Sequence, residues 1–231
     1  MGDPIPIYRF LDADGALKTL VSGRFRVGQL SKFNDPFEWR LGFAGAVAPE
    51  EQKFAEDFSS AHLVWLESWM GILCFSDSVS DPVLWALYAQ KHRGVAFEVR
   101  YPWPSGNIQQ MRYSNERPVL DFNQLRAHRD PGAREQYLTS LLGRLMNQKS
   151  LGFSFEREYR LHIDLNDRGR CQSRDGQYEW QLPDGSLKRV VLGFRCPLEE
   201  AAVRKLLDMN GLVDTKVVRA RMCSQSYAII T

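Results

Sequence analysis

The stretch that most constrains the fold is residues 153–161, Phe-Ser-Phe-Glu-Arg-Glu-Tyr-Arg-Leu. Read with the two-residue period of a β-strand, its aromatic and aliphatic side chains lie on one face together with Arg157. The other face carries Glu156, Glu158 and Arg160. We therefore predict a strand with one face in a core and two carboxylates aimed in the same direction. At this spacing the carboxylates feel each other's charge, so one is a candidate for a shifted pKa.

A second interpretation of this stretch stays open at this point. The polar residues could form a solvated strand face on which Arg160 offsets the two acids. Antiparallel sheets commonly have one face in water, so such faces are frequent. The rest of the chain has to decide between the two.

Composition limits the class of protein. The 231 residues are enough for a domain with its own core, and 44% hydrophobic and 25% charged residues are usual for a globular protein. A net charge of +2 argues against non-specific nucleic-acid binding as the main activity, but allows a local basic groove. No apolar run approaches the ~20 residues needed to cross a bilayer, and the first residues do not resemble a signal peptide. We expect a soluble cytoplasmic protein with no membrane partner.

The cysteines and histidines are scattered along the chain. No Cys-x-x-Cys pair and no Cys/His pair at zinc spacing occurs, so we expect free thiols and no metal centre. The signatures of dinucleotide-binding folds, P-loops, zinc proteases and serine hydrolases are also absent.

Periodicity and turn signals divide the chain into short strands and helices. Predicted strands cover residues 6–10, 24–28, 71–75, 94–100, 108–113, 153–163, 189–194, 216–221 and 227–230, with loops or a hairpin over 166–186. Predicted helices cover 13–22, 49–70, 134–148 and 198–209, and a further helix opens at Asp81-Pro82 and ends before Gly94. Asn34-Asp35-Pro36 predicts a turn. The elements mix without a regular β-α-β rhythm, so we predict an α+β fold and, without repeats or linkers, a single domain over residues 1–231.

Five short pieces in fixed order carry a resemblance to a known family. They are Tyr8-Arg9, Phe33-Asn-Asp-Pro-Phe-Glu38, Cys74-Phe-Ser76, Trp85-x-x-Tyr88-x-x-x-His92-x-Gly94 and Glu156-Arg-Glu-Tyr-Arg160. Together they resemble the domain-of-unknown-function 2971 family of bacteria and phages, from Tyr8 to about Phe194. That family name brings no established chemistry.

A more distant resemblance is to the Arg-Ser-Glu class of mono-ADP-ribosyltransferases. It maps onto Arg9, onto Ser76 with Ser78, and onto Glu156 with Glu158. The resemblance implies two packed, mostly antiparallel sheets with flanking helices, and a cleft that holds NAD as a substrate. The second motif departs from the class, because it reads Phe-Ser-Asp-Ser rather than Ser-Thr-Ser.

The same resemblance implies roles for single residues. Glu158 would stabilise the oxocarbenium-like transition state of nicotinamide release, and Glu156 would position or deprotonate an acceptor. Ser76 would steady the active-site strand or bond the nicotinamide ribose. The implied NAD-binding residues are Arg9 for a phosphate or ribose oxygen, together with Tyr8, Ser78, Trp85, Tyr88 and His92.

Each of these residues also has a structural interpretation. Arg9 could cap the surface of a terminal strand, and Ser76 could begin a loop that leads to a helix N-cap. Trp85 and Tyr88, three residues apart on a helix, could belong to the core rather than stack on a ligand. His92 could favour a helix C-terminus through its charge.

Three functions follow from this sequence. The first is an NAD-consuming ADP-ribosyltransferase or NAD glycohydrolase, acting on a protein or nucleic-acid acceptor as a toxin or anti-phage effector. The second is a metal-dependent nuclease that uses Glu156, Glu158 and Asp77, with nearby arginines on phosphates. The third is a non-catalytic nucleotide-binding module.

Overall fold

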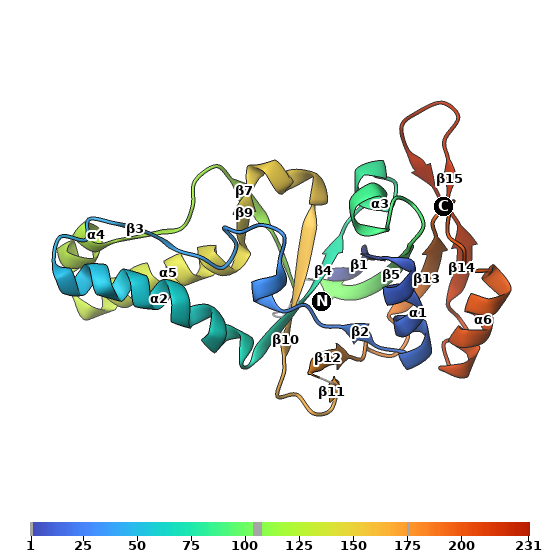
Figure 1. Ribbon diagram of the computed structural model, residues 1–231, viewed down its shortest axis with the longest axis horizontal. Coiled ribbons are helices and arrows are strands. Elements are labelled where there is room, and N and C mark those ends of the chain that lie inside the picture. Colours follow the sequence, from blue (N-terminus) through green and yellow to red (C-terminus); the bar gives the residue numbers. More distant parts are fainter. Residues whose placement is uncertain (1, 104–107, 175) are drawn as a thin grey trace.

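A computed structural model describes residues 2–103, 108–174 and 176–231 (Figure 1). At its centre lies a seven-stranded sheet. In spatial order its strands are β14 (Lys216–Arg219), β13 (Leu187–Leu192), β5 (Val95–Trp103), β1 (Gly2–Leu11), β4 (Met70–Ser76), β10 (Glu158–Asp164) and β6 (Ile108–Gln110). Neighbouring strands are antiparallel except β13 and β14, which are parallel. The predicted α+β class is confirmed.

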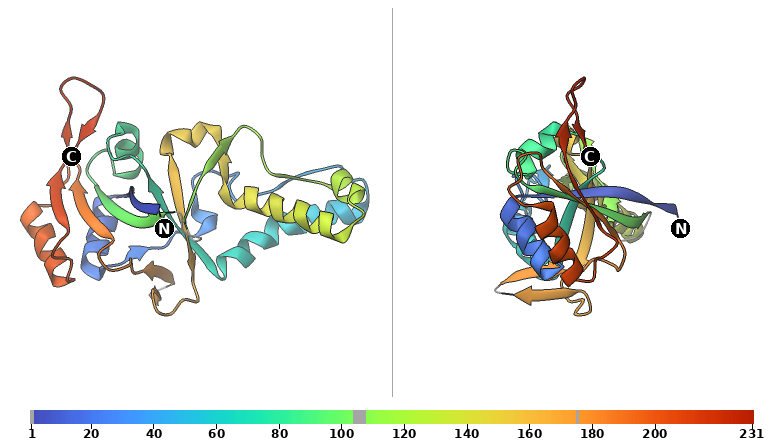
Figure 2. Two further views of the ribbon diagram at one scale, coloured as in Figure 1. Left: turned by 180° about the vertical axis from the view of Figure 1, so that it is seen from behind. Right: turned by 90° about the vertical axis from the view of Figure 1, so that its right-hand side faces the viewer.

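One face of the sheet is covered by two helices and a small sheet. The helices are α1 (Ala13–Ser22) and α6 (Glu200–Met209), which lie side by side in Figure 2. The small sheet contains β11 (Cys171–Arg174), β12 (Gln177–Trp180) and β2 (Phe25–Arg26), with the first two forming the expected hairpin. Side chains of both sheets, such as Phe97 and Trp180, share one hydrophobic core. Helix α1 has its predicted bounds and ends at Gly23, which is left-handed with φ of 68°.

The other face packs against α3 (Pro82–Tyr88) and the C-terminal hairpin of β15 (Arg221–Met222) and β16 (Ile229–Ile230). Asp81 caps α3 by accepting the N–H of Val83 at 2.8 Å, as predicted. The helix ends at Tyr88, however, well before Gly94. A glycine is needed at 94 for another reason: a Cβ there would lie 2.0 Å from the carbonyl oxygen of Leu11.

A helical arm extends from the sheet (Figure 1). It contains α2 (Pro49–Glu67), α4 (Phe122–Ala127), α5 (Pro131–Asn147) and the paired strands β3 (Gly42–Ala44) and β8 (Val119–Asp121). The arm has its own core, in which Phe43, Phe58 and Phe122 pack together. Strands β7 (Arg112–Ser114) and β9 (Gln148–Ser150) pair with each other beside the sheet. The single strand predicted over 108–113 is therefore wrong, since it divides into β6 and β7.

The predicted strand over 153–163 is wrong in its first half. Residues Leu151–Glu156 form a 3-10 helix, η2, and Arg157 is left-handed with φ of 44°. Strand β10 begins only at Glu158. The alternation of aromatic and polar residues before Glu158 belongs to this tight turn, so Glu156 and Glu158 do not lie on one strand. Glu156 nevertheless lies close to Glu158, because both carboxylates contact the ammonium of Lys149.

Candidate functional site

The site lies where the central sheet opens. Strands β1 and β4 are paired only at Tyr8 and Ser76, whereas β1 pairs with β5 all the way to Leu11. Instead of following β1 further, β4 bridges to Gly28 through Ile72. A cavity of about 310 Å³ lies at the opening between the two strands and is lined by residues of both.

Three residues from distant parts of the chain stand in one row across this opening. Tyr8 on β1 is opposite Ser76 on β4, and Ser76 is opposite Glu158 on β10. Directly opposed residues of a sheet project to the same face, so the three side chains point together. All three are buried and line the cavity.

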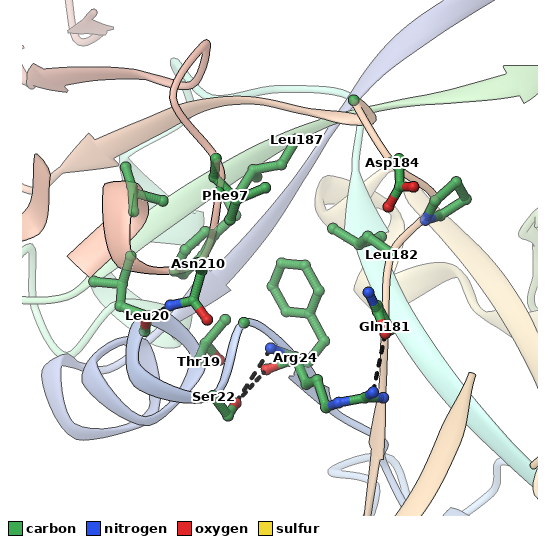
Figure 3. A pocket seen from close by; sticks show the side chains of 17 residues that line it. Thr19, Leu20, Ser22, Arg24, Phe97, Gln181, Leu182, Asp184, Leu187 and Asn210 are labelled. Atoms are coloured by element: carbon green, nitrogen blue, oxygen red, sulfur yellow. Dashed lines mark hydrogen bonds between the residues drawn. The ribbon is translucent and has the colours of Figure 1, made fainter. Parts of the chain in front are cut away.

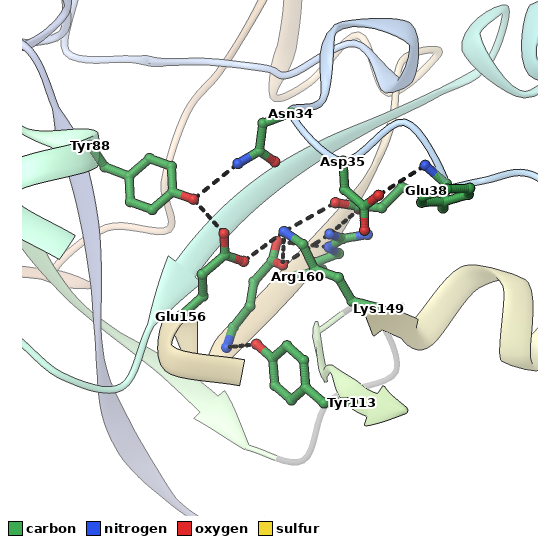
Figure 4. Close-up of polar contacts among 10 residues, drawn as sticks. Asn34, Asp35, Glu38, Tyr88, Tyr113, Lys149, Glu156 and Arg160 are labelled. Carbon is green, nitrogen blue, oxygen red and sulfur yellow. Dashed lines mark hydrogen bonds and ion pairs between the residues drawn. The ribbon is translucent and has the colours of Figure 1, made fainter. Parts of the chain in front are cut away.

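Glu158 also belongs to a buried charge cluster, which it forms with Glu38, Lys149, Glu156 and Arg160 (Figure 4). The ammonium Nζ of Lys149 is 2.6 Å from Glu156 Oε2, 3.0 Å from Glu38 Oε1 and 3.3 Å from Glu158 Oε2. Arg160 holds Glu158 through both oxygens, with Nε to Oε1 at 2.7 Å and Nη2 to Oε2 at 2.9 Å. It also pairs with Glu38. The charge cluster thus joins three separate segments of the chain.

The five side chains of the charge cluster are between 1% and 7% exposed. Three carboxylates against two cations leave one excess negative charge at the cavity. Burial alone would raise the pKa of Glu158, but Arg160 and Lys149 outweigh it and hold that pKa at about 2. Burial raises the pKa of Glu156 against the opposing effect of Lys149. The two acids are therefore not equivalent: the pKa of Glu158 is held low, so it stays ionised, whereas the pKa of Glu156 is raised.

Tyr88 connects the charge cluster to the cavity wall. Its hydroxyl donates to Glu156 Oε1 and accepts from Asn34 Nδ2 at 3.1 Å. Burial and the neighbouring Glu156 raise the pKa of Tyr88, so the hydroxyl keeps its proton. Asn34 is placed by the predicted turn, in which Asp35 Oδ1 accepts the N–H of Phe37 at 2.9 Å. Tyr88 thus contributes a hydrogen-bond donor to the site.

Arg9 forms the opposite wall of the cavity. Its Nη1 and Nη2 donate to the carbonyl oxygens of Cys74 at 3.2 Å and Arg26 at 2.9 Å, and its guanidinium lies 5.7 Å from the ring centre of Phe25. Its Nε is buried without a hydrogen-bond partner. Within the described ranges no carboxylate pairs with Arg9. Burial lowers the pKa of Arg9, as expected for a cation held by neutral groups alone.

Of the nine site residues predicted from sequence, six line this one cavity. These are Tyr8, Arg9, Ser76, Tyr88, Glu156 and Glu158. The other three lie elsewhere. The backbone N–H of Ser78 donates to Ser76 Oγ at 3.3 Å, and the side chain of Ser78 is outside the cavity.

Trp85 and His92 differ from their predicted places. Trp85 is 0% exposed, donates its indole N–H to the carbonyl of Val79 at 2.6 Å and packs against Phe10. It belongs to the core, so it cannot stack on a ligand in the structure as it stands. His92 lies beyond the end of α3 with φ of 67°, and its ring is 4.8 Å from that of Phe194. Trp85 thus follows its structural alternative. His92 does not follow its own, because α3 ends at Tyr88 and burial lowers the pKa of His92, so its charge does not serve a helix C-terminus.

The sequence did not indicate Lys149 and Glu38 as site residues, and it offered Arg160 as a charge that could offset the two acids on a solvated strand face. Glu38 belongs to one of the short family-like pieces, which was the available signal. Lys149 directly follows an amphipathic helix, where a lysine is usually solvated. Nothing in the sequence marks it as buried.

Two further cavities can be compared with that of the site by their lining residues. One of about 570 Å³ adjoins it and shares Arg9, Lys32 and Tyr88 among its lining residues. The other, of about 330 Å³, opens on the opposite face of the sheet between α1, α6 and the segment before β13 (Figure 3). It has an apolar floor that includes Phe97, and Arg24 and Asp184 are its charged lining residues. The cavity of the site, at about 310 Å³, therefore has more titratable lining residues than either of these two.

Comparison with family models, curated proteins and solved structures found no match to this chain. In the described part of the chain, no helix is both long and apolar enough to span a bilayer, and no group of three His, Cys, Asp or Glu residues is arranged to hold a metal ion. Function is therefore inferred from the cavity and the residues around it.

Proposed function

We propose that this protein is an NAD-consuming ADP-ribosyltransferase or NAD glycohydrolase that cleaves the bond between nicotinamide and ribose. The observation that carries the proposal is the uneven charge around one cavity. The charge cluster gives one wall an excess negative charge, and the other has the cation of Arg9, which pairs with no carboxylate among the described residues. NAD offers the complement, a cationic nicotinamide ring beside an anionic pyrophosphate.

The size of the site supports a ligand of this length. Ligand pockets commonly measure about 300–1,000 Å³. The first cavity, at about 310 Å³, suits the nicotinamide ribose, and the adjoining cavity of about 570 Å³ suits the rest of the dinucleotide. Arg9 and Lys32 line both, where their cations would meet the phosphates between the two halves.

The chemistry suits the two acids. When the C1′–N bond breaks, its electron pair leaves on nicotinamide, and positive charge develops on the ribose. The permanent anion of Glu158 would stabilise that charge in the transition state more than in the substrate. A water or acceptor oxygen then adds to C1′ and gives its proton to Glu156, whose raised pKa suits a base.

The resemblance to the Arg-Ser-Glu class of ADP-ribosyltransferases supports the proposal, since its three motif residues line one cavity here. We further propose that the fold is of the two-sheet type found in that class, and that the chain is related to the domain-of-unknown-function 2971 family. The same analogy, and no physical observation, suggests a cytoplasmic toxin or anti-phage effector with a protein or nucleic-acid acceptor.

The nuclease hypothesis has less support. Asp77 pairs with Arg157 at 3.1 Å and does not line the cavity, so it does not join Glu156 and Glu158. Lys149 Nζ lies between the Glu156 and Glu158 carboxylates, where a metal ion bridging the two would have to bind.

The test is release of nicotinamide from NAD by the purified protein. Glu158→Gln should lower the rate by about 10²–10³-fold, the range for losing one electrostatic group at a transition state. Glu51→Gln is the matched control, because Glu51 is also paired with an arginine but lies on the helical arm. The proposal fails if the wild type leaves NAD intact with every acceptor tried and shows no binding by calorimetry. Magnesium-dependent cleavage of nucleic acid would select the nuclease, and NAD bound but returned intact would select the binding module.

A further inference from the structure

Lys149 occupies an unusual place for a lysine. It lies on β9 between α5 and η2, its side chain is 3% exposed, and Nζ is 4.7 Å from the ring centre of Phe153. Three carboxylates surround the ammonium within 3.3 Å. Lys149 also lines the cavity. A buried lysine is normally costly, and here these three acids offset the cost.

The contacts of the two cavity acids are unequal. Both carboxylate oxygens of Glu158 accept hydrogen bonds from Arg160, and these contacts do not involve Lys149. For Glu156, Lys149 is the one cationic partner within hydrogen-bonding distance in the described part of the chain, and its other partner is the neutral hydroxyl of Tyr88. Without Lys149, the Glu156 carboxylate would face the Glu158 carboxylate with no positive charge between them.

We propose that Lys149 is a positioning residue that holds Glu156 and Glu158 together as a working pair, with Glu38 fixing the ammonium from the far side. The effect of Lys149 on catalysis rests on the proposed function. The effect of Lys149 on the geometry and ionisation of Glu156 does not. The bridge that Lys149 forms by contacting both acids can also be distinguished from simple charge balance. Glu38→Gln in a Lys149→Met background restores the net charge of the charge cluster but not the bridge between the two acids.

The first experiment does not need NAD. Carboxyl ¹³C shifts of the glutamates are followed by NMR through a pH titration of the wild type and of Lys149→Met, with Glu156→Gln and Glu158→Gln for assignment. The titration midpoint of Glu156 should rise by about one pH unit or more when Lys149 is lost, because an opposite charge at this distance shifts a pKa by that much. An unchanged midpoint overturns the proposal. The comparison is repeated in Lys149→Met/Glu38→Gln, whose charge equals that of the wild type, so that poor folding of the single variant does not hide the effect.

The second experiment separates positioning from charge balance. In the nicotinamide-release assay, Lys149→Met should lower kcat by about 10²-fold, with KM for NAD changed much less, since the acids act in the transition state. The double variant Lys149→Met/Glu38→Gln has the net charge of the wild type, although Arg160 loses its Glu38 partner, and it should not regain kcat. Recovery of kcat in this variant would show that Lys149 serves charge balance alone and would overturn the proposal. If the wild type does not cleave NAD, the proposed function falls, and the NMR titration still decides whether Lys149 pairs the two acids.

Discussion

Replacement of Arg160 by Met removes the most buried cation of the charge cluster. Arg160 is 1% exposed, and its guanidinium carbon is 5.2 Å from the ring centre of Phe33 and 5.4 Å from that of Trp39. Met is shorter than Arg but keeps an unbranched apolar chain of comparable volume, so the cost is mainly electrostatic. Breaking a buried ion pair by removing one partner costs about 3–5 kcal/mol. We expect a loss of that size at pH 7.

The pKa of Glu158 gives an independent magnitude. It falls from an ordinary 4.5 to about 2 in the folded protein, chiefly because Arg160 and Lys149 outweigh the effect of burial. At about 1.4 kcal/mol per pH unit, this corresponds to roughly 3 kcal/mol of stability. Because the folded pKa is depressed, that stability is present above about pH 4.5 and is lost as the pH falls through about 2.

Urea unfolding followed by circular dichroism measures the loss. For a chain of this size about 2–4 °C of Tm corresponds to 1 kcal/mol, so Arg160→Met should also lower Tm by about 6–20 °C. The difference from the wild type should shrink toward pH 3, where Glu158 is protonated in the unfolded chain. Arg100→Met is the control, because Arg100 is 53% exposed and 3.6 Å from Glu98, and such a pair contributes less than about 1 kcal/mol. An Arg160→Met loss no larger than that of the control would refute the electrostatic account of the charge cluster.

Four further outcomes follow from single contacts. Tyr88→Phe leaves Glu156 without its neutral donor and should cost about 1–3 kcal/mol in urea unfolding, so an unchanged midpoint contradicts the contact. The rate of acceptor modification should fall on the acid side at a pH above 4.5, since burial raises the pKa of Glu156 and a base must be ionised; a pH–rate profile without this limb, or one that persists in Glu156→Gln, argues against that role. Trp85→Ala should cost about 3–5 kcal/mol of stability, and a change in NAD affinity beyond that of a destabilised control would return Trp85 to the site. Gly94→Ala should cost at least about 1–3 kcal/mol because its Cβ would overlap Leu11, which a thermal melt checks directly.

Local signals in the sequence were enough for much of the fold. Gly23 and the Asp81-Pro82 pair marked helix ends correctly, because caps and turns depend on neighbouring residues. The start of β10 was missed for a related reason. A two-residue alternation over residues 153–157 does not distinguish a strand from a short 3-10 turn, and the left-handed Arg157 has no sequence signature of its own.

The charge cluster could not be predicted in the same way, because its contacts are not local. Arg160 and Glu38 are 122 residues apart, and Tyr88 and Glu156 are 68 apart. Charged residues are nearly always exposed, so a sequence pattern assigns them to the surface unless their partners are known. The resemblance to ADP-ribosyltransferases pointed to Arg9, Ser76 and Glu158, but it could not supply Lys149.

The cost of this arrangement is itself informative about function. Well-packed hydrophobic residues of similar volume would stabilise a sheet as well as a buried ion network does, and often better. Here the ions are concentrated at the place where β1 and β4 separate, and the pKa of one acid of the charge cluster is lowered while that of another is raised. Pairs of acids whose pKa values are shifted in opposite directions are characteristic of acid–base sites. Both acids line the cavity at the separation of the strands, and so the opening in the sheet and the charge cluster are best understood as two parts of one site.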